Sequence, residues 1–254
     1  MTVLEALLHD MDVLKAQLDQ ARPLQYPGIL QALDIEYTYE SNRIEGNTLT
    51  LRETDLIIHK GLTVGGKSMR EHLEAINHYE AVLWLRELVQ HSSPLTETLI
   101  CQLHGLILRG IDRENAGHYR RVPVMISGSR HIPPQPWQVP VLMEDCLAWY
   151  DSERHALHPV LLAAELHERI ATIHPFIDGN GRTARLVMNL ILLQNGYPIA
   201  NIPGDTESRL SYYDALEICN LTGNKNPFLL LIAQYVIAMM ERVLAVVGTI
   251  KIGD

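Results

Sequence analysis

The chain has 254 residues, 47% of them hydrophobic, which suffices for one large domain or two small ones with a substantial core. Its 21 basic and 30 acidic side chains give a formal net charge of -9, which argues against broad electrostatic binding of nucleic acid. The cysteines Cys101, Cys146 and Cys219 are far apart and form no CxxC pair, so neither a disulfide framework nor a zinc site is indicated. We expect reduced thiols in a cytoplasmic protein.

The N-terminal part of the chain has helical patterns separated by proline and glycine. Apolar residues at spacings of three and four predict an amphipathic helix over residues 4–18, and its acidic residues exclude a secretory signal. Helical spacing resumes over residues 29–39. Thr50 and Glu53 have the spacing of a capping box, which predicts a helix that begins near Leu51.

Further helices are expected over residues 69–89 and 95–108, the second with Thr96 as its N-cap. The pattern changes between Gly117 and Pro140, where alternating apolar residues and an SGSR turn predict a small β-hairpin. After it, helical patterns cover residues 141–150, 159–173, 182–195, 210–220 and 227–247.

The most apolar stretch, residues 228–240, is bounded by Glu241 and Arg242. It is shorter than the roughly 20 residues that a membrane span needs, so we expect a core helix and no membrane association. The interpretation is an all-α fold with one hairpin, in which residues 1–60 form an N-terminal helical segment and residues 61–254 the main domain.

The segment HPFIDGNGRTAR, residues 174–185, concentrates chemistry between two helices. Pro175 cannot comfortably continue the preceding helix, so His174 is expected near its end. Gly179, Asn180 and Gly181 tolerate positive φ and can form an anion-binding nest, which the N-terminus of the next helix extends.

Arg182 and Arg185 are three positions apart, so they share a helix face in a first turn where cations oppose the dipole unless an anion compensates. Two guanidiniums and a nest suit a di- or triphosphate. Asp178 beside such phosphates is a candidate ligand of Mg²⁺, with Mn²⁺ as an alternative. His174 can act as a neutral base near pH 7.

This segment resembles the signature of Fic (FIDO-domain) proteins, HPFx[D/E]GNGRxxR, and matches it at every specified position. The resemblance extends over roughly residues 69–236. It implies a protein adenylyltransferase of the Fic fold that moves AMP from ATP to a hydroxyl of a target protein. It also implies a role for each motif residue: His174 as general base, Asp178 on Mg²⁺, Asn180 and Gly181 on the phosphates, Arg182 on the α/β region and Arg185 on the γ-phosphate.

The resemblance assigns roles outside the motif as well. The hairpin becomes a flap that docks the target by strand addition, with Ile126 at the flap position and Ser129, Arg130 and His131 in its tip and return. Other side chains are placed around the adenine: Tyr212, Tyr213 and Asn220. Spacing alone would assign the tyrosine pair to core packing.

SNRIEGN, residues 41–47, resembles the Fic inhibitory motif [S/T]xxxE[G/N] through Ser41, Glu45 and Gly46. A helix that ends at Gly46 would present Glu45 where the dipole disfavours a carboxylate, and a bidentate pair with Arg185 would relieve both charges. We expect Glu45 to hold Arg185 away from the γ-phosphate, so that ATP binds unproductively.

Two alternatives stay open at this stage. The same site could hydrolyse AMP from modified targets, with Glu45 orienting a water, or the chain could be a non-catalytic nucleotide-binding interaction module. The expected partners are ATP and a target protein with a Ser, Thr or Tyr hydroxyl, and the N-terminal amphipathic helix could serve a homo-oligomer.

Overall fold

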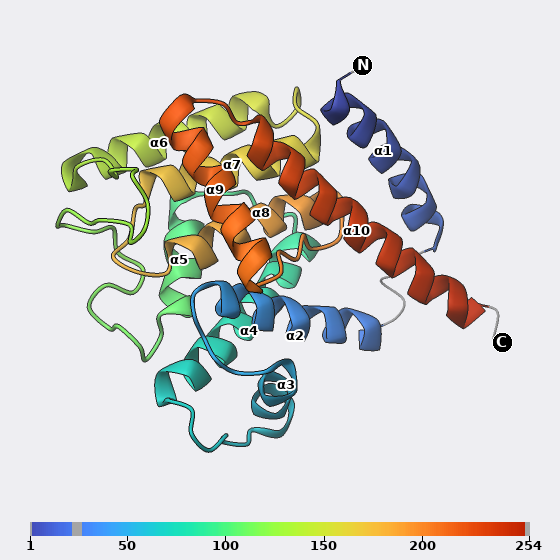
Figure 1. Cartoon of the computed structure of the whole chain (residues 1–254), viewed down its shortest axis with the longest axis horizontal. Coiled ribbons are helices and arrows are strands. Elements are labelled where there is room, and N and C mark those ends of the chain that lie inside the picture. The colour runs from blue at the N-terminus through green and yellow to red at the C-terminus, as the bar shows by residue number, and fades with distance from the viewer. Residues whose placement is uncertain (1, 22–26, 252–254) are drawn as a thin grey trace.

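A computed structural model describes residues 2–21 and 27–251, and every regular element in these ranges is helical (Figure 1). The helices follow the sequence predictions to within a few residues at most ends. Their bounds are α1 Val3–Ala21, α2 Pro27–Ile44, α3 Leu51–Lys60, α4 Met69–Gln90, α5 Glu97–Ile107, the short 3-10 helix Pro136–Gln138, α6 Val139–Glu153, α7 Pro159–Ile173, α8 Asn180–Gln194, α9 Thr206–Thr222 and α10 Asn226–Lys251.

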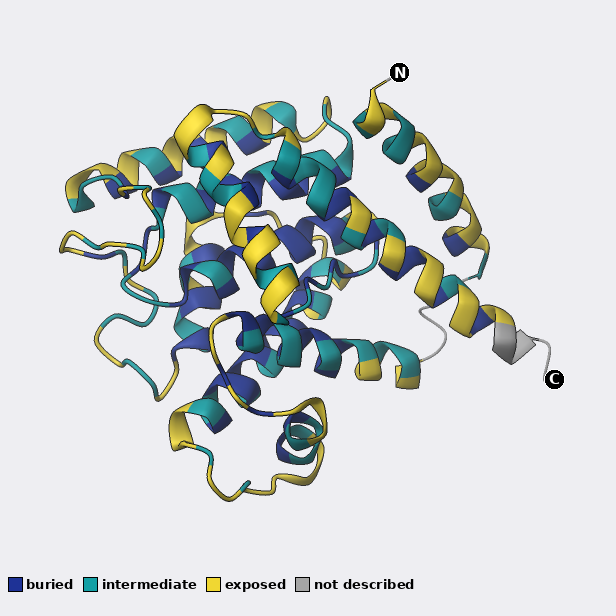
Figure 2. Cartoon of the chain, in the orientation of Figure 1, coloured by how far each residue is buried: buried dark blue, intermediate teal, exposed yellow. Residues whose placement is uncertain are grey.

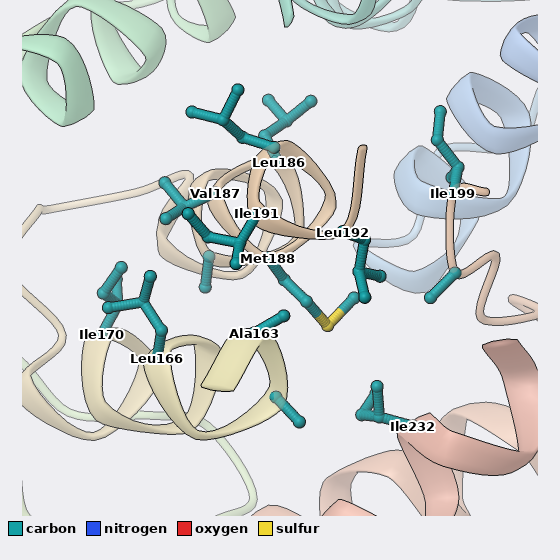
Figure 3. Packing of buried hydrophobic residues seen from close by; sticks show 14 of the residues in the cluster. Ala163, Leu166, Ile170, Leu186, Val187, Met188, Ile191, Leu192, Ile199 and Ile232 are labelled. Atoms are coloured by element: carbon teal, nitrogen blue, oxygen red, sulfur yellow. The ribbon is translucent and has the colours of Figure 1, made fainter. Parts of the chain in front are cut away.

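Helix α8 lies at the centre of the molecule, and α4, α5 and α7 pack around it. Almost all of its residues are buried, which Figure 2 shows as dark blue. Figure 3 shows its apolar side chains against those of α7 and α10: Leu186, Val187, Met188, Ile191 and Leu192 beside Ala163, Leu166, Ile170 and Ile232. The core therefore fixes the N-terminus of α8, where the motif lies.

The N-terminal helices are packed onto this core. Helix α1 lies along α10, and α2 packs against α4 and α8 (Figure 1). Met11 and Leu18 of α1 and Tyr37 and Ile44 of α2 belong to the same buried cluster as α8. The division at residue 60 stays a prediction.

The capping box predicted at Thr50 is present. Thr50 Oγ1 accepts from the Glu53 N–H (3.2 Å), and the Thr50 N–H donates to Glu53 Oε2 (2.7 Å). Helix α3 ends at Gly61, whose φ of 61° is the left-handed conformation that glycine adopts freely. Together with Leu49 and Ala75, Ile57 of α3 forms a small second cluster beside α4.

The predicted β-hairpin is not observed: residues 118–135 contain no strand in the structure. The predicted turn does exist: the Ser129 N–H donates to Ile126 O (3.2 Å), and Gly128 has a φ of 80°. Pro123 in the first arm and the Pro133–Pro134 pair in the second lack the N–H groups that a ladder needs. A two-stranded hairpin is marginal even without such gaps.

Helix α10 continues through Glu241 and Arg242, in agreement with the helical pattern predicted over residues 227–247. By length and composition alone, Asn226–Gly248 qualifies as a membrane span, with a mean hydropathy of 1.9. Buried core helices pass the same test, and 39% of this stretch is buried. Arg242 pairs with both carboxylate oxygens of Glu36 on α2, at 2.6 and 2.7 Å.

Candidate active site

The motif loop between α7 and α8 is held by its own side chains. His174 caps α7 in the left-handed conformation, with a φ of 51°. The Asn180 side chain accepts from the Phe176 N–H (2.8 Å) and donates to Phe176 O (2.9 Å), so it fastens the loop. Asn180 can therefore contribute to phosphate binding through its backbone N–H, while its side chain is already committed.

His104 of α5 also contacts this loop, and the sequence analysis did not identify this residue. Its ring stacks on Phe176, with centroids 3.6 Å apart. Its Nε2 donates to Asp178 O (2.9 Å) and its Nδ1 accepts from the Gly117 N–H (2.9 Å), so a neutral ring of one tautomer satisfies both contacts. Burial lowers the pKa of His104 to about 4, so the ring stays neutral at pH 7.

The contacts of His174 fix the tautomer of its neutral ring. Its Nδ1 faces Ala171 O at 3.3 Å, and because a carbonyl only accepts, Nδ1 carries the proton of the neutral ring. The Nε2 lone pair is then available to a substrate. Burial lowers the pKa of His174 to about 4, with smaller lowering effects from the charges of Arg120 and His131.

The start of α8 presents an anion site. The first backbone hydrogen bond of α8 runs from the Thr183 N–H to Gly179 O (2.9 Å), so the N–H groups of Asn180, Gly181 and Arg182 have no partner within the helix. Gly179 precedes them with a φ of 75°, as the predicted nest requires. Bound phosphate oxygens are suitable acceptors for these groups.

Arg182 is buried with donors unused. Only 2% of its surface is exposed, and its Nε and Nη1 make no hydrogen bond to the described residues. Glu74 Oε1 lies 3.4 Å from Nη1, and Asp178 Oδ1 lies 3.5 Å from Nη2. Orphaned guanidinium donors beside a helix N-terminus fit a polyphosphate.

Arg185 is also buried, and the predicted inhibitory residues surround it. Its Nε donates to Ser41 Oγ (3.0 Å), and its Nη2 donates to Ser41 O (2.9 Å) and to Glu45 Oε1 (2.7 Å). The expected bidentate geometry is wrong, because Glu45 uses one oxygen. The expected helix end is also two residues late: α2 stops at Ile44, and Gly46, with a φ of 93°, follows in a turn.

Gly181 explains how the Glu45 carboxylate reaches the start of α8. A Cβ atom at this position would lie 2.4 Å from Glu45 Oε1 and 3.0 Å from Arg185 Nη1. Any side chain would therefore collide with the carboxylate. The space above Gly181 is a cradle for an anionic oxygen, and Glu45 fills it.

Asp178 is the candidate metal ligand, and both of its oxygens are in contact with donors. Oδ1 accepts from the Gly179 N–H (2.6 Å), and Oδ2 accepts from Arg70 Nη2 (2.5 Å). Burial raises the pKa of Asp178, but the Arg182 charge, the Gly179 N–H and Arg70 together bring it below the ordinary value. Among the described residues, no group of three or more His, Cys, Asp or Glu side chains is arranged to hold a metal ion.

The residues predicted around the adenine have separate surroundings. The hydroxyl of Tyr212 lies 3.5 Å from Arg185 Nη1 and 2.9 Å from His167 Nε2 in the core. Tyr213 is 41% exposed and donates to Ile44 O (3.2 Å), immediately before the inhibitory turn. Asn220 contacts the Thr172 hydroxyl near the end of α7.

The residues predicted to dock a target hold the loop to the helices. Arg130 Nε donates to Glu217 Oε1 on α9 (2.7 Å), and His131 Nε2 donates to Thr172 O on α7 (2.9 Å). Ser129 Oγ accepts from the His131 N–H (3.1 Å), and Ile126 is half-buried. Their contact with a target stays a prediction.

Comparisons with known proteins agree with this fold. Residues 94–192 match the Fic/DOC family. The structure of Fic-1 (residues 134–508) from C. elegans superposes with a TM-score of 0.86 at 30% identity, covering 99% of this chain and 74% of that one. A Fic-domain signalling protein from Bacteroides thetaiotaomicron gives a TM-score of 0.80 at 28% identity, covering 98% and 97% of the two chains.

Curated relatives share the same region. The protein adenylyltransferase Fic of Drosophila grimshawi is 38% identical over 199 residues, which are 78% of this chain and 40% of the relative. That of Drosophila melanogaster is 39% identical over the same length, 39% of the relative. The chain thus spans about two fifths of the length of these relatives. The fold is a helical domain in which the N-terminus of one buried helix carries free backbone N–H groups, and the chain belongs to the Fic/DOC family.

Proposed function

We propose that this chain is a protein adenylyltransferase in an autoinhibited state, which transfers AMP from ATP to a Ser, Thr or Tyr hydroxyl of a target protein. The observation that carries the proposal is the neutral His174 beside a helix N-terminus with two buried arginines, one of which is held by Glu45. The activity named for the Drosophila relatives supports it.

In this proposal the triphosphate lies along the start of α8. The free N–H groups there and the unused donors of Arg182 take the α- and β-phosphates, and Arg185 takes the γ-phosphate once it is released. Asp178 would hold Mg²⁺, which would neutralise charge on the phosphates when bound. Tyr213 would contact the adenine, and its partial exposure beside Ile44 supports this role.

The chemistry needs one base and a fixed geometry. The target hydroxyl gives its proton to His174 Nε2, and its oxygen forms a bond to the α-phosphorus. The bond between the α-phosphorus and the bridging oxygen breaks, and pyrophosphate leaves with the electron pair. A base whose pKa lies well below 7 is unprotonated and ready at neutral pH.

Inhibition follows from competition for one place. Glu45 Oε1 occupies the cradle over Gly181 and takes Arg185 Nη2, so a γ-phosphate meets a carboxylate where it needs a cation. Removing the carboxylate frees the cradle and the arginine. We expect Glu45→Gly to raise AMP transfer by about 10- to 100-fold, the equivalent of one charge-assisted hydrogen bond.

Intact-mass spectrometry of the purified protein and a cell lysate with ATP tests this proposal. Glu45→Gly should add AMP, and Glu45→Gly with His174→Ala should add none while still binding nucleotide. An unmodified Glu45→Gly protein that binds ATP contradicts transfer. If Glu45→Gly instead abolishes release of AMP from a modified target, the chain is chiefly a hydrolase.

We also propose a cytoplasmic location, supported by the cysteines. Cys101, Cys146 and Cys219 are free thiols in the structure. Such thiols suit a reducing compartment.

A further inference from the structure

Arg120 is a buried arginine that neither the motif nor the inhibitory segment includes. Only 2% of its surface is exposed, and its guanidinium faces backbone carbonyls. Its Nε donates to His174 O (2.8 Å), its Nη2 to Pro134 O (2.5 Å) and its Nη1 to Val122 O (3.3 Å). Its own N–H donates to Pro175 O (2.9 Å).

The charge of Arg120 has no carboxylate partner among the residues that the structure describes. Burial lowers the pKa of Arg120, as expected for a cation removed from water. What compensates the charge is the C-terminal end of α7, where Arg120 also approaches Ile173 O at 3.5 Å. Helix C-termini carry partial negative charge, and a planar fork can reach several carbonyls at once.

The carbonyls that Arg120 joins belong to two functional segments. Val122 and Pro134 are the two ends of the loop that contains Ile126, Arg130 and the turn at Gly128. This loop has no strand ladder to close it. The third carbonyl belongs to the catalytic base itself, in the left-handed cap of α7.

We propose that Arg120 is a positioning residue that fastens both ends of the loop 122–134 to the backbone of His174, so that the target-docking loop and the base keep one fixed relation. This inference rests on the proposed transfer reaction. It requires no contact between Arg120 and the nucleotide, since the guanidinium donates to backbone carbonyls.

A second consequence concerns the charge at the base. The groups that act on His174 are Arg120 and His131, which disfavour its protonated form, and Glu45 and Ala171 O, which favour it. Removing the Arg120 charge therefore raises the pKa of His174. The acid limb of the transfer rate must then move to higher pH.

The test compares Arg120→Ala and Arg120→Lys in the Glu45→Gly protein, with Arg113→Ala, an exposed arginine of the preceding loop, as the control. We expect Arg120→Ala to lower the transfer rate about 100-fold, because a displacement of about 1 Å has that effect on a positioned reaction. Nucleotide affinity by calorimetry should change less than about twofold. Lys should restore part of the rate, and the Arg113 variant should match its parent.

Hydrogen exchange tests whether Arg120 holds the loop 122–134 against His174, and this measurement does not depend on transfer activity. In Arg120→Ala, amides of residues 122–134 and 172–176 should exchange faster together, while those of α8 stay protected. The inference is overturned if exchange in these segments is unchanged, if transfer stays within about twofold of the parent, or if transfer and nucleotide binding fall together with no move of the acid limb. If the Glu45→Gly protein transfers no AMP, the proposed function is contradicted. The hydrogen-exchange comparison still tests the positioning role of Arg120 in that case.

Discussion

Asp178, the proposed Mg²⁺ ligand, already has hydrogen-bond partners at both of its carboxylate oxygens. Arg70 holds Oδ2, while Oδ1 is taken by the Gly179 N–H. Arg70 also donates to Glu74 Oε1 (3.1 Å), which in turn lies beside Arg182. If Asp178 holds Mg²⁺ as proposed, the ion would compete with Arg70 for the charge of this carboxylate.

We expect Arg70→Ala to lower the Mg²⁺ concentration that supports half-maximal nucleotide binding by severalfold, in proportion to a partly exposed ion pair. Calorimetry with a non-hydrolysable ATP analogue at several Mg²⁺ concentrations measures this. Arg52→Ala, an exposed arginine on α3, serves as the control. An unchanged Mg²⁺ dependence would show that the ion pair between Arg70 and Asp178 does not weaken Mg²⁺-supported nucleotide binding.

At the scale of elements, the inhibitory turn depends on how α2 is seated. Gly204, in the loop before α9, donates to Glu40 Oε2 (2.6 Å). A Cβ on Gly204 would lie 2.7 Å from Arg43 Cβ and 2.9 Å from Glu40 O. Glu40 O belongs to the helix backbone and cannot move by itself. The last turn of α2 would therefore have to shift, and Glu45 would shift with it.

Gly204→Ala is therefore expected to raise AMP transfer although it touches no site residue. The increase should be smaller than that of Glu45→Gly, because the carboxylate is displaced and not removed. Gly28→Ala on the first turn of α2 is the matched control, since a Cβ there meets nothing within 4 Å. Equal transfer rates in the two glycine variants would show that the position of the last turn of α2 does not affect inhibition by Glu45.

What the sequence predicts at this scale is what lies close along the chain. The capping box at Thr50, the nest at Gly179 and the helix periods are local, so pattern alone finds them. The loop 118–135 also has local signals of a hairpin, but a strand ladder needs backbone N–H donors, and the prolines of this loop have none. The alternation of apolar residues therefore predicted strands that do not form, whereas the turn at Gly128 was predicted correctly.

Supporting residues lie beyond the reach of such patterns. His104 is 74 positions from Asp178, Arg70 is 108 positions from it, and Arg120 is 54 positions from His174. A lone histidine or arginine in a helical or irregular segment has no spacing that marks it. The packing of α4 and α5 around α8 brings Arg70 and His104 to the motif, and the segment that follows α5 brings Arg120.

The whole molecule keeps several histidines neutral inside its core, and this couples its stability to pH. Burial lowers the pKa of His104 to about 4 and that of His167 to about 3, from an ordinary value of 6.5. Both rings have no exposed surface. Because the folded pKa values are depressed, these groups contribute stability in full above pH 6.5, and the contribution is lost as the pH falls toward 4.

The expected loss at pH 5 follows from proton linkage. The unfolded chain binds nearly one proton at each of His104 and His167, whereas the folded chain binds almost none, so each lowers the free energy of unfolding by about 2 kcal/mol. Urea unfolding at pH 7 and pH 5 should therefore show a midpoint that falls with little change of slope. Equal midpoints at the two pH values would mean that these histidines gain protons in the folded state, and that the core admits water where the structure has none of their surface exposed.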